Sequence, residues 1–485
     1  MDTYAGRVQI RWAPDEEVTP LGQLPFLIDF LKQGGLFDAF VEGAPLSYSS
    51  NNRPRVRDVL GTLLLAILSG ARRYMHVNVL RHDAVNPRLL GMQRVCSDDS
   101  VRRAIARMDE KEATGWLRKH LERSLRPLWQ QPWVLDIDTS VKPVYGHQEG
   151  AQVGYNPHKP GRASLVVHSY LMGELRLVLD TEVEPGKQVH SMYSLPGLER
   201  LLDGMQPQER PALVRGDRHY GTERVMVALE ERGQDYLFRL ILRPRVKALV
   251  ARLASEGGWQ KVGRGWEATE SKLQLQGWTR VRRVVLLRRQ VRERKQAEPK
   301  QHGQLPLPFT EVVEAGPKYE YGVLVTSLQD ERLTVAQLYR DRADVENAFD
   351  ELKNQWGWGG FMTQDLKRTR IMVRMNALFY NWWSVYARMI DPDTRREAKT
   401  SRPMMMDGVA RVTRHGRQTT LVLTIAHSAA ARLRESFEEM ARFLRELPTA
   451  PQLAEAERWC RILERAYKKY YGDRGLRLTA RPLLA

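Results

Sequence analysis

Three acidic residues that lie far apart in the chain have surroundings suited to binding a metal ion. Asp138 follows the run "WVLDI", Asp217 ends "PALVRGD", and Glu346 lies within "YRDRADVENAFDELK". Open α/β sheets place functional side chains where strands end, and carboxylate oxygens are the ligands that Mg²⁺ and Mn²⁺ prefer. Each aspartate is equally explained as an ordinary cap or turn residue. Asp136 adds an ambiguity, because it would point to the same face of its strand as Asp138.

The segment around Glu346 spaces one phenol, one carboxylate and two cations at helical intervals. Tyr339, Arg342, Glu346 and Lys353 stand at offsets of 0, 3, 7 and 14 residues. On a single helix with about 100° per residue, all four side chains fall within about 60° of one another, and Thr334 is suited to cap the N-terminus of that helix. Such a stripe could hold a metal ion beside a phosphate. It also fits a solvated helix face whose ion pairs are worth a few tenths of a kcal/mol each.

The charge of the chain favours a polyanionic partner. Among 485 residues, 76 are Lys or Arg and 58 are Asp or Glu, which gives a formal net charge of +18. Positive charge spread along a chain is typical of nucleic-acid binding, with a membrane surface as the alternative. The sequence contains no apolar run of about 18 residues and no N-terminal signal segment, so we expect a cytoplasmic protein that does not enter a membrane.

The cysteine content restricts the kind of metal site. The two cysteines, Cys96 and Cys460, exclude a cysteine-rich zinc site and a disulfide framework. Any metal that the protein binds would therefore be held by carboxylates.

Apolar runs predict an α/β sheet in the middle of the chain. Strands are expected at 133–141, 163–172, 174–186, 211–217 and 235–242, with helices after the third and the fourth strand. This order, β-β-β-α-β-α-β, indicates a mixed sheet with helices on its faces. After residue 242 the alternation stops for about 90 residues, and strands there lead into a polar, proline-rich hairpin tip at 295–309.

The order and the contexts of the three acids resemble those of the DDE transposases of bacterial insertion sequences. One subgroup of that family carries the signature Y-x2-R-x3-E-x6-K, which Tyr339, Arg342, Glu346 and Lys353 match in full. "DIDTS" looks like the family's first-aspartate strand, "RGDRHYG" like its second, and "GYNPHKPGRAS" like a basic loop before the second strand. The resemblance covers about residues 55 to 390. His219 is a small departure, since a small residue is expected there.

The resemblance implies an RNase H-like catalytic domain that uses two divalent ions, Mg²⁺ or Mn²⁺. Asp138 and Asp217 would come from adjacent strands, and Glu346 from the helix. We expect Asp138 to bridge both ions, with Asp217 and Glu346 each completing one site. If the third acid is not Glu346, Asp350 and Glu351 are the next candidates.

Five basic or aromatic residues are expected to contact DNA. Arg342 would hold a phosphate beside the scissile bond with its fork of donors, and Lys353 would do so as a point charge. Tyr339 would hydrogen-bond a phosphate or stack on a base. Lys159 and Arg162 in "KPGR" would contact phosphates, although a plain surface turn explains them nearly as well.

The expected fold is α/β, with an RNase H-like mixed sheet flanked by helices. A helical N-terminal DNA-binding region would span 1–128, and the first part of the catalytic domain 129–242. A β-rich insertion would span 243–332, the second part of the catalytic domain 333–394, and a helical C-terminal region 395–485, with one strand at "TTLVLTI".

The resemblance implies a DNA transposase that binds the terminal inverted repeats of its element as a homodimer. It would cut double-stranded DNA and join the 3′ ends to target DNA. An RNase H-like nuclease without strand transfer is an alternative, and a catalytically silent DNA-binding derivative is another. Trp356 and Trp358 in "NQWGWGGF" fit a packed helix end better than a base-stacking loop.

Overall fold

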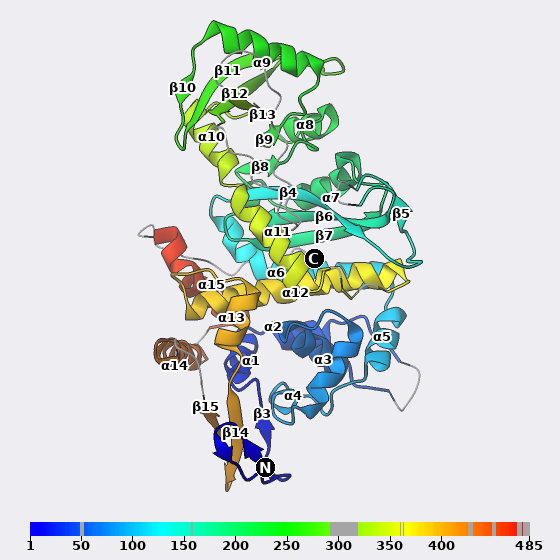
Figure 1. The fold of residues 1–485 in the computed structure, drawn as a ribbon, viewed down its shortest axis with the longest axis vertical. Helices are drawn as coiled ribbons and strands as arrows, with labels where there is room; N and C mark the ends of the chain where they lie inside the picture. Colours follow the sequence, from blue (N-terminus) through cyan, green and yellow to red (C-terminus); the bar gives the residue numbers. More distant parts are fainter. Residues whose placement is uncertain are drawn as a thin grey trace. The chain divides into compact units, whose positions relative to one another are not determined.

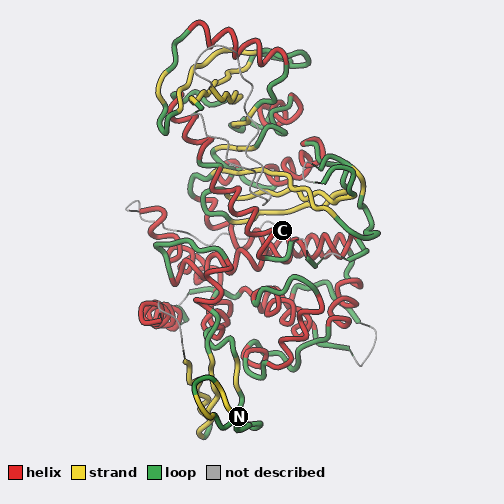
Figure 2. Tube along the Cα trace, viewed as in Figure 1, coloured by secondary structure: helices red, strands yellow, loops and turns green. Residues whose placement is uncertain are grey.

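The computed structural model describes residues 1–48, 53–156, 159–291, 319–358, 360–361, 363–424, 430–448, 453–472 and 478. The chain forms two compact units. Unit 1 comprises Met1–Trp116, Lys353–Phe361 and Phe379–Ala485, and unit 2 comprises Leu117–Leu352 and Met362–Leu378. Figure 1 labels their elements and Figure 2 shows the strands that gather in unit 2. The predicted hairpin tip at 295–309 lies outside the described residues.

Unit 2 is built on one mixed sheet, which runs in the order β10-β11-β12-β13-β9-β8-β4-β6-β5, with β7 also paired to β6. Its first strands are β4 (Val134–Pro143), β5 (Gln152–Val153), β6 (Ala163–Met172), β7 (Leu177–Pro185), β8 (Leu213–Gly216) and β9 (Tyr236–Arg239). The others are β10 (Gln260–Lys261), β11 (Trp266–Leu273), β12 (Arg282–Gln290) and β13 (Tyr319–Thr326). The five strands expected between 133 and 242 are therefore confirmed.

The pairing places β4 between an antiparallel part and a parallel part of the sheet. On one side, β4 pairs antiparallel with β6, which pairs antiparallel with β7. On the other side, β4 pairs in parallel with β8, and β8 in parallel with β9. Parallel neighbours need crossover connections, and α7 (Ser191–Asp203) and α8 (Glu223–Glu230) lie within these connections. The expected mixed sheet with helices is confirmed.

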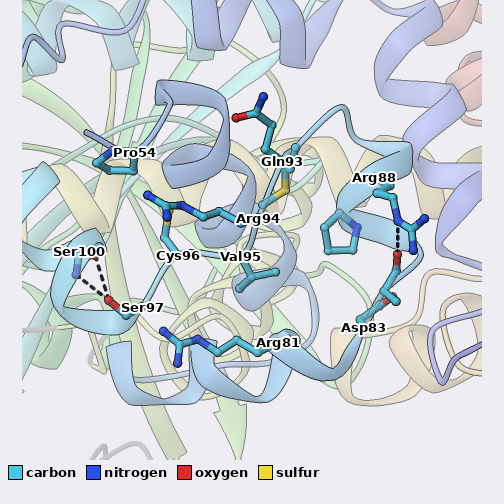
Figure 3. Close-up of a pocket in the computed structure, with 13 residues that line it drawn as sticks. Pro54, Arg81, Asp83, Arg88, Gln93, Arg94, Val95, Cys96, Ser97 and Ser100 are labelled. Carbon is cyan, nitrogen blue, oxygen red and sulfur yellow. Dashed lines mark hydrogen bonds between the residues drawn. The ribbon is translucent and has the colours of Figure 1, made fainter. Parts of the chain in front are cut away.

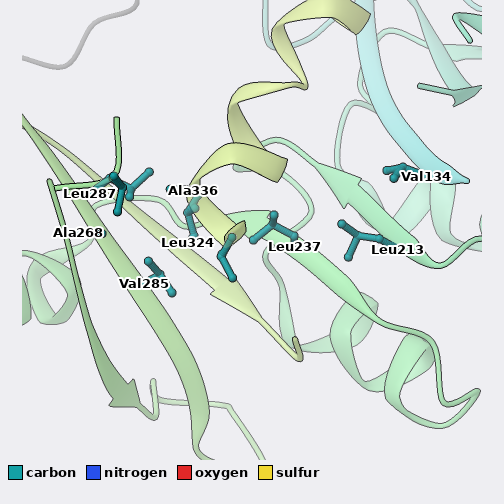
Figure 4. Close-up of a cluster of buried hydrophobic side chains, with 10 residues drawn as sticks. Val134, Leu213, Leu237, Ala268, Val285, Leu287, Leu324 and Ala336 are labelled. Carbon is teal, nitrogen blue, oxygen red and sulfur yellow. The ribbon is translucent and has the colours of Figure 1, made fainter. Parts of the chain in front are cut away.

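The strands after residue 242 extend this sheet. β13 pairs antiparallel with β9, and β12 and β11 follow in turn. A continuous hydrophobic core joins the strands before residue 242 to those after it (Figure 4). Its buried members include Val134, Leu213, Leu237, Val285, Leu324 and Ala336. The region also begins with a helix, α9 (Pro244–Glu256), which the strand-rich interpretation of 243–332 missed although Pro244 stands at a position typical of a helix start.

Three arginines converge on one buried carboxylate and fix helices to the sheet of unit 2. Asp180 on β7 is fully buried. It accepts hydrogen bonds from Arg118 of α6 (Glu110–Leu125) and from Arg200 of α7, each over 2.7 Å. It also accepts a hydrogen bond from Arg374 of α12 (Leu366–Ile390) over 3.0 Å. Glu182 pairs with Arg118 and Arg200 as well. Burial raises the pKa of Asp180, but the three guanidiniums bring that pKa below its ordinary value. This stabilisation is therefore present above the unfolded-state pKa of about 3.9 and is lost as the pH falls through the folded-state value.

Unit 1 joins the two ends of the chain in one helical core. It contains α1 (Leu24–Gln33), α2 (Leu36–Glu42), α3 (Val56–Leu68), α4 (Asn86–Leu89), α5 (Asp98–Arg107), α13 (Ala398–Met405), α14 (Ala430–Glu446), α15 (Glu455–Tyr471) and the 3-10 helix η1 (Tyr74–His82). Phe26 of α1 stacks on Phe437 of α14 at 4.6 Å between ring centroids, and Phe30 meets Trp459 of α15 at 5.8 Å.

A small sheet and a packed helix end complete unit 1. The hairpin β14 (Val409–His415) and β15 (Gln418–Thr424) pairs with β3 (Val18–Thr19), which confirms the strand expected at "TTLVLTI". Trp356 and Trp358 are buried, and Arg402 stacks on the Trp356 ring at 4.0 Å, so the packing interpretation of this segment is confirmed. Within the described ranges, none of the helices combines the length and the apolar character that crossing a bilayer requires.

We expect the substitution Asp180→Asn to destabilise unit 2 strongly. Removing one partner from a buried ion-pair network typically costs about 3–5 kcal/mol, because the remaining buried charges lose their compensation. Chemical unfolding measures this loss. Asp203→Asn is the control, since Asp203 pairs with Arg232 at the surface with 53% of its side chain exposed, and exposed pairs contribute at most about 1 kcal/mol. Equal losses in the two variants would contradict the anchoring role of Asp180.

Candidate active site

The first two acids lie where two parallel strands separate. β4 and β8 are paired up to Ile137 and Gly216, and the next residues are Asp138 and Asp217, with 19% and 27% of their side chains exposed. The expectation that they come from adjacent strands is confirmed. β4, however, continues to Pro143 because it stays paired with β6. Asp138 therefore lies inside its strand, and its predicted position at the strand end is wrong.

Asp136 has a structural partner. Its two carboxylate oxygens accept hydrogen bonds from Nε and Nη2 of Arg215, each over 2.7 Å. Both side chains are 1% exposed. Arg215 also donates to the carbonyl of Leu338 on α10 (Arg332–Arg340), so the pair links β4 and β8 to this helix. A bidentate guanidinium thus occupies both oxygens of Asp136, and Asp138, with 19% of its side chain exposed, is the more open of the two carboxylates.

A hydrogen-bond chain holds the backbone beside Asp138. Tyr220 contacts Thr139 over 2.8 Å, Thr139 contacts Nδ1 of His168 over 3.1 Å, and Nε2 of His168 lies 2.9 Å from the carbonyl of Gln188. A carbonyl only accepts, so Nε2 carries the proton and Nδ1 accepts from Thr139. Burial lowers the pKa of His168 to about 4, which keeps the ring neutral.

The close approach of Tyr220 explains the glycine of "RGD". A side chain at Gly216 would place its Cβ 2.9 Å from Tyr220 Cδ2 and 3.0 Å from Ile137 Cγ1. Sequence reasoning missed the roles of Tyr220 and His168. Their positions in the sequence could have indicated these roles. Tyr220 follows Asp217 by three residues, and His168 lies in the apolar run of the expected second strand.

The helix expected around Glu346 is broken in two. α10 ends at Arg340, α11 (Ala343–Gln355) begins three residues later, and Arg342 lies in the connection. The amide of Arg342 donates to the carbonyl of Tyr339, three residues back, which interrupts the α-helical pattern. The prediction of one helix with a single stripe is therefore wrong, and so is the cap at Thr334, since Glu331 occupies the N-cap position.

The break directs Arg342 inward, between two acids. Its Nη2 lies 3.0 Å from Oδ1 of Asp138 and its Nη1 lies 2.9 Å from Oε1 of Glu346. The Arg342 side chain is 7% exposed, whereas Glu346 is 57% exposed. Burial opposes the charged form, but the acids around the guanidinium, Asp138 first, raise the pKa of Arg342 above its ordinary value. One cation thus links the first and the third of the three acids, Asp138 and Glu346.

Asp217 has a partner of its own. The backbone amide and Nδ1 of His219 both lie 2.9 Å from its carboxylate oxygens. Burial raises the pKa of Asp217, but the hydrogen bond from His219 and the charge of Arg342 bring it below its ordinary value. The same hydrogen bond raises the pKa of His219. The residue that departs from the family pattern is therefore in direct contact with the second acid, and Tyr155 packs edge-on against its ring at 6.2 Å.

The remaining residues of the signature take different positions. Tyr339 on α10 is partly buried against the hydrophobic core of the sheet, and burial raises the pKa of its phenol. Tyr339 is therefore neutral. It lies near Arg342, whose positive charge acts against the rise in the pKa of the phenol. Lys353 is exposed in the last turn of α11 and forms no ion pair with a described residue.

The two basic residues of "KPGR" gather on one aromatic ring. Nζ of Lys159 lies 4.8 Å from the centroid of the Tyr145 ring, and the guanidinium carbon of Arg162 lies 4.7 Å from it. All three side chains are exposed. They form a cationic surface cluster, which the described contacts do not connect to the three acids.

The donor set fits a hard divalent cation, although the described residues contain no group of three acids, histidines or cysteines arranged to hold a metal. Asp138, Asp217 and Glu346 offer oxygen donors from three elements, and each also has a cationic or polar partner. Among the alternatives for the third acid, Glu351 is buried and Asp350 is exposed. Glu346 is the acid that shares a guanidinium with Asp138.

Comparison with known proteins identifies the family. Residues 47–445 match the family described as Transposase DDE domain group 1. Curated proteins give no match. Among solved structures, the chain is similar to a piggyBac transposase in a synaptic complex with hairpin DNA, with 13% sequence identity and a TM-score of 0.41, over 92% of this chain and 86% of that chain. Because the family match covers most of the chain, this protein belongs to the DDE transposases, a family that generally uses divalent metal ions, and it is a DNA transposase.

Proposed function

We propose that this transposase binds the terminal inverted repeats of its own insertion sequence as a homodimer, within the bacterial cytoplasm. It cleaves the ends by metal-dependent hydrolysis and joins the 3′ ends to target DNA. The observation that carries this proposal is that three acids from three parts of the chain act on one guanidinium, that of Arg342, two through ion pairs and Asp217 through its charge. Asp138 and Asp217 stand on adjacent parallel strands, and Arg342 bridges Asp138 to Glu346.

The three carboxylates would hold two Mg²⁺ or Mn²⁺ ions, with Asp138 shared and with Asp217 and Glu346 each serving one ion. When bound, such ions activate the attacking oxygen and neutralise charge on the phosphate. His219 keeps Asp217 ionised and oriented through two hydrogen bonds. The neutral chain of Tyr220, Thr139 and His168 keeps the backbone of Asp138 in place without adding a competing positive charge.

Two consecutive displacements at phosphorus account for the reaction. In the first, a water oxygen forms a bond to the phosphorus at the element end, and the bond from phosphorus to the 3′ oxygen breaks. In the second, the freed 3′-hydroxyl attacks a phosphodiester of target DNA, so that one phosphodiester forms as another breaks. The same three carboxylates serve both displacements because each needs a deprotonated oxygen in line with its leaving group.

The basic residues outside the carboxylate set would hold DNA phosphates. Lys353 is exposed and without an ion-pair partner among the described residues, so it is available as a point charge. Lys159 and Arg162 form a cationic cluster on Tyr145 that fits a DNA strand at the surface. Tyr339 is partly buried, which favours a hydrogen bond to a phosphate over stacking on a base. Residues 129–242 and 333–394 would form the catalytic domain, with the insertion at 243–332 between them.

The N-terminal region contains a cavity suited to phosphate groups. It measures about 520 Å³, and Arg81, Arg88, Arg94 and Asp83 are among the residues that line it (Figure 3). Asp83 is buried and hydrogen-bonded to Thr19 and to backbone amides. Arg88 pairs with Glu17. Arg81 and Arg94 are exposed and form no ion pair with a described residue, so their charges are available to DNA in the region expected to recognise the element ends.

We expect Glu346→Gln to abolish cleavage while leaving DNA binding intact. The amide keeps the size of the side chain but removes the charge that holds a metal ion. The measurement is cleavage of a duplex carrying the element end, with Mg²⁺ and with EDTA, beside a binding assay on the same duplex. EDTA should stop the wild-type protein, and the variant should lose about 10³-fold or more in rate, as for loss of a principal electrostatic stabiliser.

Asp341→Asn is the control for this experiment, because Asp341 is exposed in the connection between α10 and α11 and bonds to Gln337. Cleavage that survives Glu346→Gln would move the third acid to Asp350 or Glu351. Binding without cleavage by the wild-type protein would favour a silent DNA-binding derivative. Cleavage without joining to target DNA would favour a nuclease.

We expect the double substitution Arg81→Ala and Arg94→Ala to weaken binding of the element end. Each lost phosphate contact should lower the slope of log K against log salt concentration by about 1. Binding isotherms at several salt concentrations measure this slope. Arg73→Ala is the matched control, since Arg73 is exposed just before η1 and does not line the cavity. A loss of the same size in the control would indicate diffuse electrostatic attraction and would argue against a phosphate site in the cavity.

A further inference from the structure

The Arg342 guanidinium is buried in unit 2 between Asp138 and Glu346, two of the three acids of the candidate site. We propose that the Arg342 guanidinium occupies the place of a divalent ion in the metal-free protein, and that it must withdraw from Asp138 and Glu346 before the metal can bind. This inference rests on the proposed function, because it concerns the same three acids. It gives Arg342 a positioning role that precedes its contact with DNA.

The contacts of Arg342 are those of a counter-ion. Its two terminal nitrogens face one oxygen of Asp138 and one oxygen of Glu346, over 3.0 and 2.9 Å. Asp217 lies near enough for its charge to act on the same guanidinium. Without a cation, carboxylates that share a site repel one another and tend to take up protons. Arg342 therefore offsets the repulsion between Asp138 and Glu346 until a metal arrives.

The guanidinium and a metal ion compete for the same oxygens. An oxygen that accepts from a guanidinium at about 3 Å cannot also bind Mg²⁺ at about 2.1 Å without bringing two cations into close contact. The fork of Arg342 is also incompletely satisfied, since its buried Nε has no hydrogen-bond partner among the described residues. Its ion pairs with Asp138 and Glu346 hold Arg342 in place, and a metal that takes those oxygens releases it.

The backbone around Arg342 allows this withdrawal. Arg342 lies in the connection between α10 and α11, outside both helices, so that its side chain can turn without unwinding a helix. Glu346, its second partner, is 57% exposed and has room to follow the metal. A guanidinium released at this point lies beside the scissile phosphate, where its fork matches two phosphate oxygens. Metal entry and phosphate binding would thus be coupled through one side chain.

The test is direct metal binding without DNA. Binding of Mn²⁺, followed by its electron paramagnetic resonance signal, is compared for wild type, Arg342→Gln, Arg342→Lys and the control Arg252→Gln. Arg252 is exposed on α9 and pairs with Glu256, so its loss changes the net charge equally. We expect Arg342→Gln to bind Mn²⁺ about tenfold more tightly or better, and Arg342→Lys to lie between it and wild type. The control should match wild type.

Thermal unfolding gives a second readout. Without metal, Arg342→Gln should melt below wild type because its acids lose their counter-ion, and added Mn²⁺ should raise its melting temperature more than it raises that of wild type. Mn²⁺ affinity in Arg342→Gln equal to or weaker than that of wild type would overturn the proposal, as would no binding in any variant. Tighter Mn²⁺ binding by Arg342→Gln, together with a failure of the wild-type protein to cleave the element end, would uphold this proposal and contradict the proposed function instead.

Discussion

Mutual repulsion among carboxylates is the constraint on which the candidate site depends. A metal-dependent site needs several acids within a few ångströms, and the folded chain must tolerate them before the ions arrive. The structure meets this need with two partners for the three acids. Arg342 spans Asp138 and Glu346, and His219 holds Asp217. The break between α10 and α11 follows from the same need, because it leaves Arg342 free to turn toward the sheet.

The surrounding scaffold repeats this pairing at a deeper level. Asp136 forms a buried ion pair with Arg215, and Asp180 forms ion pairs with arginines from three helices. These buried pairs contribute orientation more than net stability, since desolvation offsets much of their attraction. They fix β4, β8 and the helices against which the open acids are positioned. Some of the arginines of the chain are thus paired with its own acids, and the net charge of +18 is what remains to attract a polyanion.

The sequence predicts the five strands between 133 and 242 well, because an apolar run of strand length is recognisable without knowledge of distant contacts. The position of Asp138 at a strand end was wrong, because pairing with β6 continues β4 to Pro143. The break at Arg342 was missed because a tertiary ion pair overrides a helical period. His219 was noticed only as a departure, since its contact with Asp217 requires the turn after β8. The joining of β13 to β9 is invisible locally, because strand pairing depends on partners about 90 residues apart.

The pairing of β13 with β9 has a consequence for how this chain can change. β9 carries no side chain of the candidate site, yet it lies next to the strand that leads to Asp217. A shortened chain without residues 243–332 would leave β9 as a bare edge, and it would remove Val285 and Leu324 from the core they share with Leu213. Unpaired edges of that kind invite aggregation. The strands that follow residue 242 therefore belong to the same sheet as β4 and β8, and a viable shorter relative would need a different strand to close the same edge.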